Sequence, residues 1–302
     1  MKALVVGYGS IGKRHCEVLE NLDFISSVSL VTSQEVRDKI CYKNLQSVPN
    51  LSQFGYFIIA TPTFLHLENL KFLDERVKGK IIFCEKPLFE TAHKFTPQNN
   101  KIFVGYVLRF HPLLQKLKEL LANEKILFIN ASCGQYLPTW RNDDYKLSYS
   151  ADKLKGGGVL LDLSHEIDYT TWLGGKLNRI KSFKGKISDL EITSDDLCVI
   201  LGKNQSGAIV NISIDYISKI SRRELLVECE NSTFRLDFIA NKLVKKDKFD
   251  SEEIFQTPNL QRNELFVKMH EDIFKEQKFI CKFNEGLETM ETIFKIQRQN
   301  NE

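Results

Sequence analysis

A glycine-rich turn directly after the first apolar segment is the feature that most restricts what this 302-residue chain can fold into. Residues 3–6 have the length and composition of a buried strand, and the next six read Gly-Tyr-Gly-Ser-Ile-Gly before a helical pattern begins. In this setting the first glycine permits a tight turn, the second lets the backbone approach a pyrophosphate, and the third allows close helix–strand packing. The amides and dipole of the helix start attract phosphates. The sequence therefore predicts a dinucleotide site at Gly7, Gly9, Ser10, Ile11 and Gly12.

The first hundred residues alternate between apolar segments of strand length and amphipathic helical segments. The strand candidates are residues 3–6, 28–31, 57–60, 81–84 and 102–104. Helical spacing recurs between them, as at residues 11–22 and 64–73. Continuously apolar strands that alternate with helices indicate a parallel sheet covered on both faces, and right-handed crossovers make it doubly wound. We predict an α/β fold in which residues 1–108 form an N-terminal Rossmann dinucleotide-binding domain.

Strands with a period of two follow one more amphipathic helix at residues 113–121. Ile212, Ile214 and Tyr216 point to one side of such a strand, while the polar residues between them point to the other. Residues 225–230 and 234–238 repeat the pattern across a turn, and the last forty residues return to helix. One polar face per strand indicates an antiparallel sheet with one open side. We predict that residues 109–302 form an α+β domain with an open, mainly antiparallel sheet for substrate binding and oligomerisation.

Charge and cysteine distribution restrict the class of protein. The 42 basic and 39 acidic residues leave a net charge of only +3, which gives no electrostatic basis for nucleic-acid binding. The seven cysteines lie at least 25 residues apart, which excludes CxxC pairs and fits a reducing compartment. No apolar run approaches the roughly 20 residues that span a bilayer, and the start of the chain lacks a signal-peptide core. We expect a cytoplasmic protein that binds neither nucleic acid nor a membrane.

The end of the second strand bears on the choice between NAD and NADP. An acidic residue about 20 positions after the glycine turn would bind the ribose 2′-hydroxyl of NAD. This chain instead has Thr32 and Ser33 there, and its first carboxylate is Glu35. Hydroxyl groups together with Arg37 would accommodate a 2′-phosphate. We expect NADP or NAD, with a slight preference for NADP, bound by Thr32, Ser33 and Arg37.

Four further segments carry a family resemblance. They read Ala-Thr-Pro-Thr-Phe-Leu-His at 60–66, Glu-Lys-Pro at 85–87, Val-Gly-Tyr at 104–106 with Arg-Phe at 109–110, and Gly-Gly-Gly-Val-Leu-Leu-Asp-Leu-Ser-His-Glu-Ile-Asp at 156–168. In this order, and with the glycine turn, they resemble the Gfo/Idh/MocA family of sugar and polyol oxidoreductases. The resemblance covers about the first 175 residues, and the antiparallel region fits the family's second domain by pattern. It implies hydride transfer between a nicotinamide and a hydroxyl or keto carbon of a sugar or nucleotide sugar.

The resemblance also implies roles for single residues. Thr61, Pro62 and His66 would line the cofactor groove, at a strand end where open α/β sheets bind ligands. In the next segment, Glu85, Lys86 and Pro87 would adjoin the cofactor. The lysine would lie near the nicotinamide ribose and the reacting carbon, with a cis peptide before the proline. In the last segment, His165 matches the family's catalytic histidine, and Asp168 matches the acid one turn later.

The chemistry of alcohol oxidation gives a compatible answer. A group must take the hydroxyl proton while hydride leaves the carbon, and histidine suits this task near neutral pH. A nearby ammonium stabilises the developing alkoxide, so Lys86 and His165 form the minimal pair, and hydride transfer needs no metal. A histidine on an apolar helix is also compatible with a hydrogen-bonded core residue. Many family members place an aspartate four residues before the histidine, whereas here Leu161 stands there and Asp162 is three before it. Both spacings lie on one helix face, so Asp162 is the third catalytic candidate.

A long irregular segment at residues 135–150 is rich in aromatic and polar side chains. Loops of this length usually bind something. Trp140 would stack on a sugar face, and Arg141 or Arg109 would hold a phosphate or carboxylate. Tyr106 and His111 are further candidates for the substrate pocket. The alternative for the segment is an ordered surface loop or a subunit contact.

Two other function classes share parts of the pattern. A non-catalytic NAD(P)-sensing regulator would use the same scaffold, but the presence of both Lys86 and His165 argues against it. A glycine-rich methyltransferase is disfavoured by the Glu-Lys-Pro segment. The alternating apolar positions of the open sheet predict a homo-oligomer. The sequence leaves the exact sugar and the direction of reaction open.

Overall fold

The computed structural model describes residues 1–140 and 144–299, and the chain divides into two compact units. Unit 1 comprises Met1–Phe110 and Gln261–Leu287, and unit 2 comprises His111–Leu260 and Glu288–Glu302. The sequence predicts a single boundary after residue 108, whereas the structure returns a C-terminal segment to unit 1. The cause is local pairing: β15 (Cys281–Lys282) adds an antiparallel edge strand beside β6 (Lys101–Val104).

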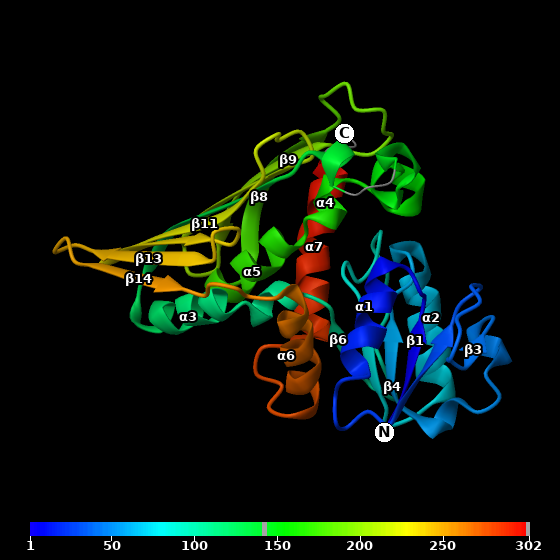
Figure 1. Cartoon of the computed structure of the whole chain (residues 1–302). Coiled ribbons are helices and arrows are strands. Elements are labelled where there is room, and N and C mark those ends of the chain that lie inside the picture. Colours follow the sequence, from blue (N-terminus) through cyan, green and yellow to red (C-terminus); the bar gives the residue numbers. More distant parts are fainter. Residues whose placement is uncertain (141–143, 300–302) are drawn as a thin grey trace. The chain divides into compact units, whose positions relative to one another are not determined.

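Unit 1 is built around a seven-stranded sheet with the order β15-β6-β5-β4-β1-β2-β3 (Figure 1). Its remaining strands are β1 (Lys2–Val6), β2 (Ser27–Val31), β3 (Cys41–Tyr42), β4 (Phe54–Ile59) and β5 (Ile81–Cys84). These strands and β6 pair in parallel. The order 3-2-1-4-5-6 is that of a dinucleotide-binding doubly wound sheet. The predicted Rossmann fold is confirmed, although the short β3 was not predicted.

Apolar residues bury the sheet of unit 1 under helices. Ala3, Leu4 and Val5 have no exposed surface, as expected for strands covered on both faces. The helices are α1 (Ser10–Leu19), α2 (His66–Arg76) and α6 (Arg262–Phe274), and α7 (Phe283–Gln299) begins in unit 1 and ends in unit 2. Helix α6 packs against α1, where Arg14 donates a hydrogen bond of 2.6 Å to Asn263.

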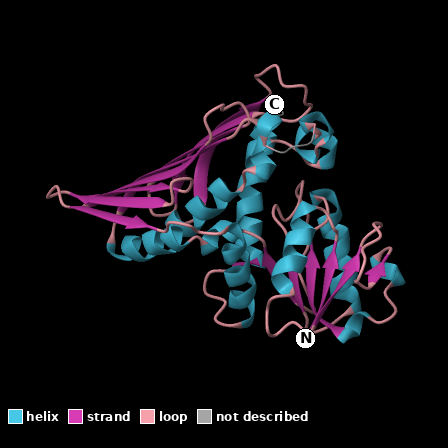
Figure 2. Ribbon diagram, viewed as in Figure 1, coloured by secondary structure: helices cyan, strands magenta, loops and turns pink. Residues whose placement is uncertain are grey.

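Unit 2 contains an eight-stranded sheet with the order β14-β13-β12-β11-β7-β10-β9-β8 (Figure 2). The strands are β7 (Ile126–Gly134), β8 (Leu177–Gly185), β9 (Leu197–Asn204), β10 (Ile209–Asp215), β11 (Arg222–Cys229), β12 (Ser232–Asp237), β13 (Lys242–Asp247) and β14 (Glu252–Gln256). Neighbouring strands are antiparallel except β7 and β10, which run parallel. The predicted mainly antiparallel sheet is confirmed.

Helices α3 (Pro112–Leu120), α4 (Val159–Asp162) and α5 (His165–Gly174) contact one face of this sheet. The opposite face includes Phe183, Leu201 and Ile209, which are 57%, 52% and 41% exposed. Ile212 and Ile214 are buried as predicted, but Asp215 is buried too, against the expected alternation. Its carboxylate pairs with Arg222 at 2.6 Å and accepts the amides of the following turn, so burial costs it no polar partner.

A buried ion pair joins helix α5 to the sheet of unit 2. Arg223 Nε donates to Glu166 Oε1 at 2.8 Å, and the glutamate side chain has no exposed surface. Burial opposes the charge of Arg223, but the adjacent Glu166 carboxylate more than compensates and raises its pKa. This pair fixes the helix that begins at His165. Within the described part of the chain, no helix is long and apolar enough to cross a membrane.

The ion pair predicts a large cost for removing its cation. Arg223→Met leaves the Glu166 carboxylate buried without a counter-charge, so the free energy of unfolding should fall by about 3 kcal/mol. The double variant Arg223→Met/Glu166→Gln removes that charge and should recover part of the loss. Urea denaturation followed by circular dichroism measures both, and equal stability of wild type and Arg223→Met would contradict the expectation.

Candidate functional site

The glycine turn between β1 and α1 has room for a side chain at only one of its three glycines. Gly7 has φ +99°, and a Cβ there would lie 2.6 Å from the carbonyl oxygen of Ala60. A Cβ on Gly12 would overlap the carbonyl oxygen of Gly7. Around Gly9, by contrast, a Cβ meets no heavy atom of the described chain within 4 Å. Open space beside the helix start, with close packing on either side, is the geometry that a pyrophosphate requires.

The N-terminus of α1 presents its amides to that space. Gly9 is the N-cap, and among the described residues no side chain caps the helix and no acidic residue occupies its first turn. The amides of the first turn, which include Ser10 and Ile11, therefore keep the capacity to bind an anion. The residues present fit a dinucleotide at this site.

The end of β2 carries the predicted ribose-binding residues. Thr32 is half-buried, and its hydroxyl accepts the amide of Gln34 at 3.1 Å. Ser33 and Arg37 are exposed. The side chain of Gln34 donates to the carbonyl of Tyr8 at 3.2 Å, which ties this loop to the glycine turn.

Three strand ends meet at the carboxyl edge of this sheet. The amide of Gly7 donates to Val31 O at 2.9 Å and that of Ala60 to Val6 O at 2.8 Å. The amide of Glu85 donates to Ile59 O at 2.9 Å. The glycine turn and the segments that begin at residues 60 and 85 are therefore adjacent.

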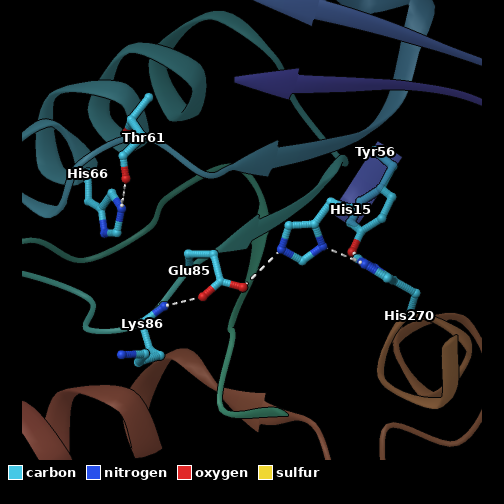
Figure 3. Close-up of polar contacts among 7 residues, drawn as sticks. All are labelled: His15, Tyr56, Thr61, His66, Glu85, Lys86 and His270. Carbon is cyan, nitrogen blue, oxygen red and sulfur yellow. Dashed lines mark hydrogen bonds and ion pairs between the residues drawn. The ribbon is translucent and has the colours of Figure 1, made fainter. Parts of the chain in front are cut away.

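His66 bridges two of these segments from a buried position. Its Nε2 lies 2.9 Å from Thr61 O and its Nδ1 lies 3.0 Å from Pro87 O (Figure 3). Burial lowers the pKa of His66, against the opposing effect of the carbonyls, so the neutral ring donates to one of the two at a time. Thr61 Oγ1 accepts from Asn69 at 3.2 Å. His66 thus joins the two segments from behind.

Lys86 follows a buried carboxylate at the end of β5. Glu85 is 7% exposed, and its Oε2 accepts the backbone amide of Lys86 at 3.1 Å. The Lys86–Pro87 peptide bond is cis, as the family resemblance implied. The Lys86 side chain is part-buried, while Pro87 is buried.

Glu85 also ends a chain of buried polar side chains, drawn in Figure 3. Its Oε1 lies 2.9 Å from His15 Nε2, and His15 Nδ1 lies 2.9 Å from His270 Nε2. The hydroxyl of Tyr56 lies 2.7 Å from His270 Nδ1. His15 is thus an interior residue, not the groove-wall or capping residue that the sequence suggested.

Tyr106 and Arg109, expected near the substrate, are buried in unit 1 at 1% and 2% exposure. The guanidinium of Arg109 pairs with Glu285, in the first turn of α7, at 3.2 Å. This ion pair holds the start of α7 against the end of the Rossmann segment. The structure therefore shows a structural partner for Arg109 in addition to the predicted ligand role.

In unit 2, the triple glycine before His165 is required by close backbone packing. A Cβ on Gly157 would overlap Tyr149 O, and Gly158 has φ +116° with its Cβ position 2.5 Å from Asp195 Oδ1. Asp195 Oδ2 in turn accepts the amide of Leu160 at 3.0 Å, in the first turn of α4. This packing sets where α4 and α5 begin.

The acidic candidates of unit 2 are buried beside His165. Asp168 is 1% and His165 9% exposed, and the histidine is the first residue of α5. Asp162 is 4% exposed, and its carboxylate accepts a hydrogen bond of 2.5 Å from the Tyr216 hydroxyl. Burial, followed by the charge of Asp162, raises the pKa of Tyr216 well above its usual range, so the phenol stays protonated. Asp162 is thus held by a donor that the sequence analysis did not single out.

A cavity of about 230 Å³ lies in the irregular segment of unit 2. Its lining comprises Leu137, Trp140, Asp144, Tyr145, Leu147, Ser148 and Ser150. The Trp140 ring packs against Tyr216, with centroids 5.7 Å apart. Arg141 lies outside the described residues. His111 is the N-cap of α3, where its Nδ1 accepts the amide of Leu113 at 3.3 Å and its Nε2 lies 3.0 Å from Asn241 Oδ1.

The predicted site residues therefore fall into two groups. The cofactor candidates and Lys86 gather in unit 1, whereas His165, Asp162 and Asp168 gather in unit 2. Sequence reasoning missed His15, His270 and Tyr56 as members of the first group. Both histidines lie on apolar helix stripes, since His15 precedes Val18 by three residues and His270 follows Phe266 by four. A histidine on a stripe that faces the core needs buried partners, and that signal was available.

Comparison with known families decides what this arrangement is. Residues 1–97 match the profile described as "Oxidoreductase family, NAD-binding Rossmann fold", and residues 114–235 match the GFO/IDH/MocA C-terminal domain. The chain belongs to the Gfo/Idh/MocA family. It is accordingly an NAD-binding oxidoreductase, as its glycine turn and strand order indicate. No curated protein matches the sequence significantly.

Solved structures share the fold over the whole chain. Levoglucosan dehydrogenase in complex with NADH and levoglucosan has a TM-score of 0.86 at 17% identity, covering 100% of this chain and 97% of its own. UDP-N-acetylglucosamine 3-dehydrogenase GnnA from Acidithiobacillus ferrooxidans has a TM-score of 0.79 at 15% identity, covering 99% and 97%. An oxidoreductase from Agrobacterium radiobacter, in complex with NAD+, L-tartaric acid and magnesium, has 0.81 at 13%, covering 100% and 96%. At these identities the likeness establishes the fold.

The three glycines should differ in how they respond to alanine. Gly9→Ala places a methyl group in the open space and should weaken dinucleotide binding about tenfold or more with little loss of stability. Gly12→Ala should instead lower the thermal unfolding midpoint, because its methyl group overlaps backbone. Titration calorimetry and thermal unfolding measure the two effects. Gly185→Ala, whose Cβ would meet only Phe183 at 3.9 Å, is the matched control. Unchanged affinity in Gly9→Ala would remove the pyrophosphate from this turn.

Proposed function

We propose that this enzyme transfers hydride between a nicotinamide dinucleotide and a hydroxyl or keto carbon of a sugar or nucleotide sugar. The observation that carries the proposal is the shared sheet edge of unit 1, where the glycine turn, Thr61-Pro62 and Lys86 follow neighbouring strand ends. A lysine beside a dinucleotide-binding turn supplies a cation where the reactive ring is expected. Family membership and the sugar dehydrogenases among the structural neighbours support the same reaction class.

The chain's own side chains supply the proton chemistry. The bound dinucleotide would accept or donate hydride at the nicotinamide ring. We assign to His165 the removal of the substrate hydroxyl proton, and to the Lys86 ammonium the stabilisation of the negative oxygen that results. In the opposite direction the same groups protonate and polarise a carbonyl. Asp162 is assigned a supporting role, because its carboxylate is engaged by Tyr216 at 2.5 Å.

A sugar substrate is supported by the cavity beside Trp140. Aromatic rings stack on the apolar faces of sugar rings, and hydroxyl groups such as those of Ser148 and Ser150 hydrogen-bond to sugar hydroxyls. At about 230 Å³ the cavity suits part of a sugar more than a whole nucleotide sugar. The dehydrogenase neighbours named for levoglucosan and for UDP-N-acetylglucosamine act on substrates of this class.

For the cofactor we propose NADP or NAD, with a slight preference for NADP. Exposed Ser33 and Arg37 at the end of β2 offer a hydroxyl and a guanidinium to a 2′-phosphate. The structural neighbours named above were solved with NADH or NAD+, so both cofactors belong in the assays below.

Substitution of the two catalytic candidates tests the reaction. Lys86→Ala and His165→Ala should each lower kcat by about a hundredfold or more, with dinucleotide affinity within about tenfold of wild type. Turnover is followed as nicotinamide absorbance with a panel of sugars and nucleotide sugars. Lys71→Ala, on the surface of α2, is the control for loss of a lysine. Near-wild-type turnover in either variant removes that residue from the mechanism, and dinucleotide binding without turnover of any sugar favours a regulator.

We also propose a homo-oligomer formed through the open face of the unit 2 sheet. Phe183, Leu201 and Ile209 expose large apolar surface on neighbouring strands there, and such patches mark interfaces. Sedimentation velocity at micromolar concentration should show an assembly larger than a monomer. Leu201→Lys should dissociate it, whereas Leu154→Lys, at a highly exposed position outside the sheet, should not. A monomeric wild type would contradict the proposal.

A further inference from the structure

The four-residue polar chain behind Lys86 consists of Tyr56, His270, His15 and Glu85 and comes from four different elements. Tyr56 lies in β4, His270 in α6, His15 in α1, and Glu85 directly after β5. The first three side chains have no exposed surface, and Glu85 is 7% exposed. The successive contacts measure 2.7, 2.9 and 2.9 Å, and Glu85 then accepts the Lys86 amide at 3.1 Å (Figure 3).

One assignment of protons satisfies every contact in this chain. An ionised Glu85 carboxylate has no proton to give, so His15 must carry its proton on Nε2 and accept on Nδ1. His270 must then donate from Nε2 and accept on Nδ1, and Tyr56 donates its hydroxyl proton. Each neutral ring thus uses its single N–H once, and the direction of the chain is set from the Glu85 end.

The surroundings agree with neutral imidazoles and a protonated phenol. Burial, and next the neighbouring His15, lower the pKa of His270 well below its usual range. Burial raises the pKa of Tyr56 well above its usual range. The rings of Phe83 and Phe266 meet His15 edge-on at 5.1 and 5.5 Å, which leaves water little access to replace a lost partner.

We propose that His15 and His270 are positioning residues, which hold the Glu85 carboxylate so that it fixes the backbone amide of Lys86. The inference rests on the proposed function, in which the Lys86 ammonium acts on the substrate. Because Glu85 and Lys86 are adjacent in sequence, a shift of the carboxylate moves the backbone that carries the ammonium.

Gly105 supplies a second, independent constraint on the same carboxylate. A Cβ on Gly105 would lie 3.0 Å from both Cδ and Oε1 of Glu85. The carboxylate therefore sits against a bare backbone on one side while His15 Nε2 and the Lys86 amide hold its two oxygens. This explains the glycine in the Val-Gly-Tyr segment at 104–106, which the resemblance gave without a role. It also explains why α6 returns to unit 1, since that helix carries His270.

The first test measures the position of Lys86 through turnover. His15→Phe keeps a ring of similar size but removes both hydrogen bonds, so kcat should fall about tenfold or more, with dinucleotide Kd and substrate KM within about threefold. His15→Gln restores a donor and an acceptor about as far apart as the two ring nitrogens, and it should recover most of that loss. Equal kcat in wild type and His15→Phe, or no recovery in His15→Gln despite folding, overturns the proposal.

The second test reads the proton direction and needs no activity. In Glu85→Gln the amide NH2 faces His15, which must accept on Nε2, so both imidazoles should switch to the Nδ1–H tautomer with the Tyr56 oxygen as final acceptor. Spectra of protein with 15N-labelled histidine distinguish the tautomers, and wild type should show Nε2–H at His15 and His270. Tautomers that do not respond to residue 85 overturn the chain.

A double-mutant cycle joins the two readouts. Tyr56→Phe removes the final acceptor, so the double variant Glu85→Gln/Tyr56→Phe should lose more kcat than the product of the single effects, although residues 56 and 85 do not pair directly. Simple multiplication of the effects would overturn coupling through the histidines. If instead Lys86→Ala leaves turnover unchanged while the tautomers switch as stated, the proposed function fails and the hydrogen-bond chain stands.

Discussion

Close approach of backbone to backbone at the start of α1 is the constraint on which the rest of unit 1 depends. Gly7 and Gly12 leave no room for a side chain, because β1, α1 and the end of β4 meet there. This contact directs the first helical turn at the space beside Gly9 and brings the end of β4 next to the turn. The hydrophobic strands supply the stability of the sheet, but this contact determines where its ligand-binding edge lies.

Behind that edge, polar groups are held by buried histidines. His66 lies between the carbonyls of Thr61 and Pro87, and His15 lies between Glu85 and His270. Imidazole suits such positions because it combines a flat apolar ring with two polar atoms at fixed separation. The two rings connect β4, β5, α1 and α6 at the level where Lys86 leaves the sheet. Order at the surface of the site is thus established in the core below it.

The sequence predicts the Rossmann segment well because each of its elements has a local signature. Apolar runs identify the strands, and the glycine spacing identifies the turn, so residues 81–84 coincide with β5. The return of residues 261–287 to unit 1 was not predicted, because a two-residue edge strand such as β15 has too few residues to show a period. The same limit applies to pairs. Asp162 was predicted from its spacing to His165, but its partner Tyr216 lies 54 residues away and has no local pattern that points to it.

The discontinuous composition of unit 1 has a consequence for how such a chain can be recombined. Exchange of the first 110 residues with those of a relative would separate α1 and β5 from the α6 that evolved beside them, and would leave Tyr56 facing a foreign helix. A chimera that respects the architecture needs two crossover points, one on each side of residues 261–287, in addition to the junction near residue 110. The heritable module for binding the dinucleotide is therefore a split segment, and its C-terminal piece travels with the nucleotide-binding part of the molecule.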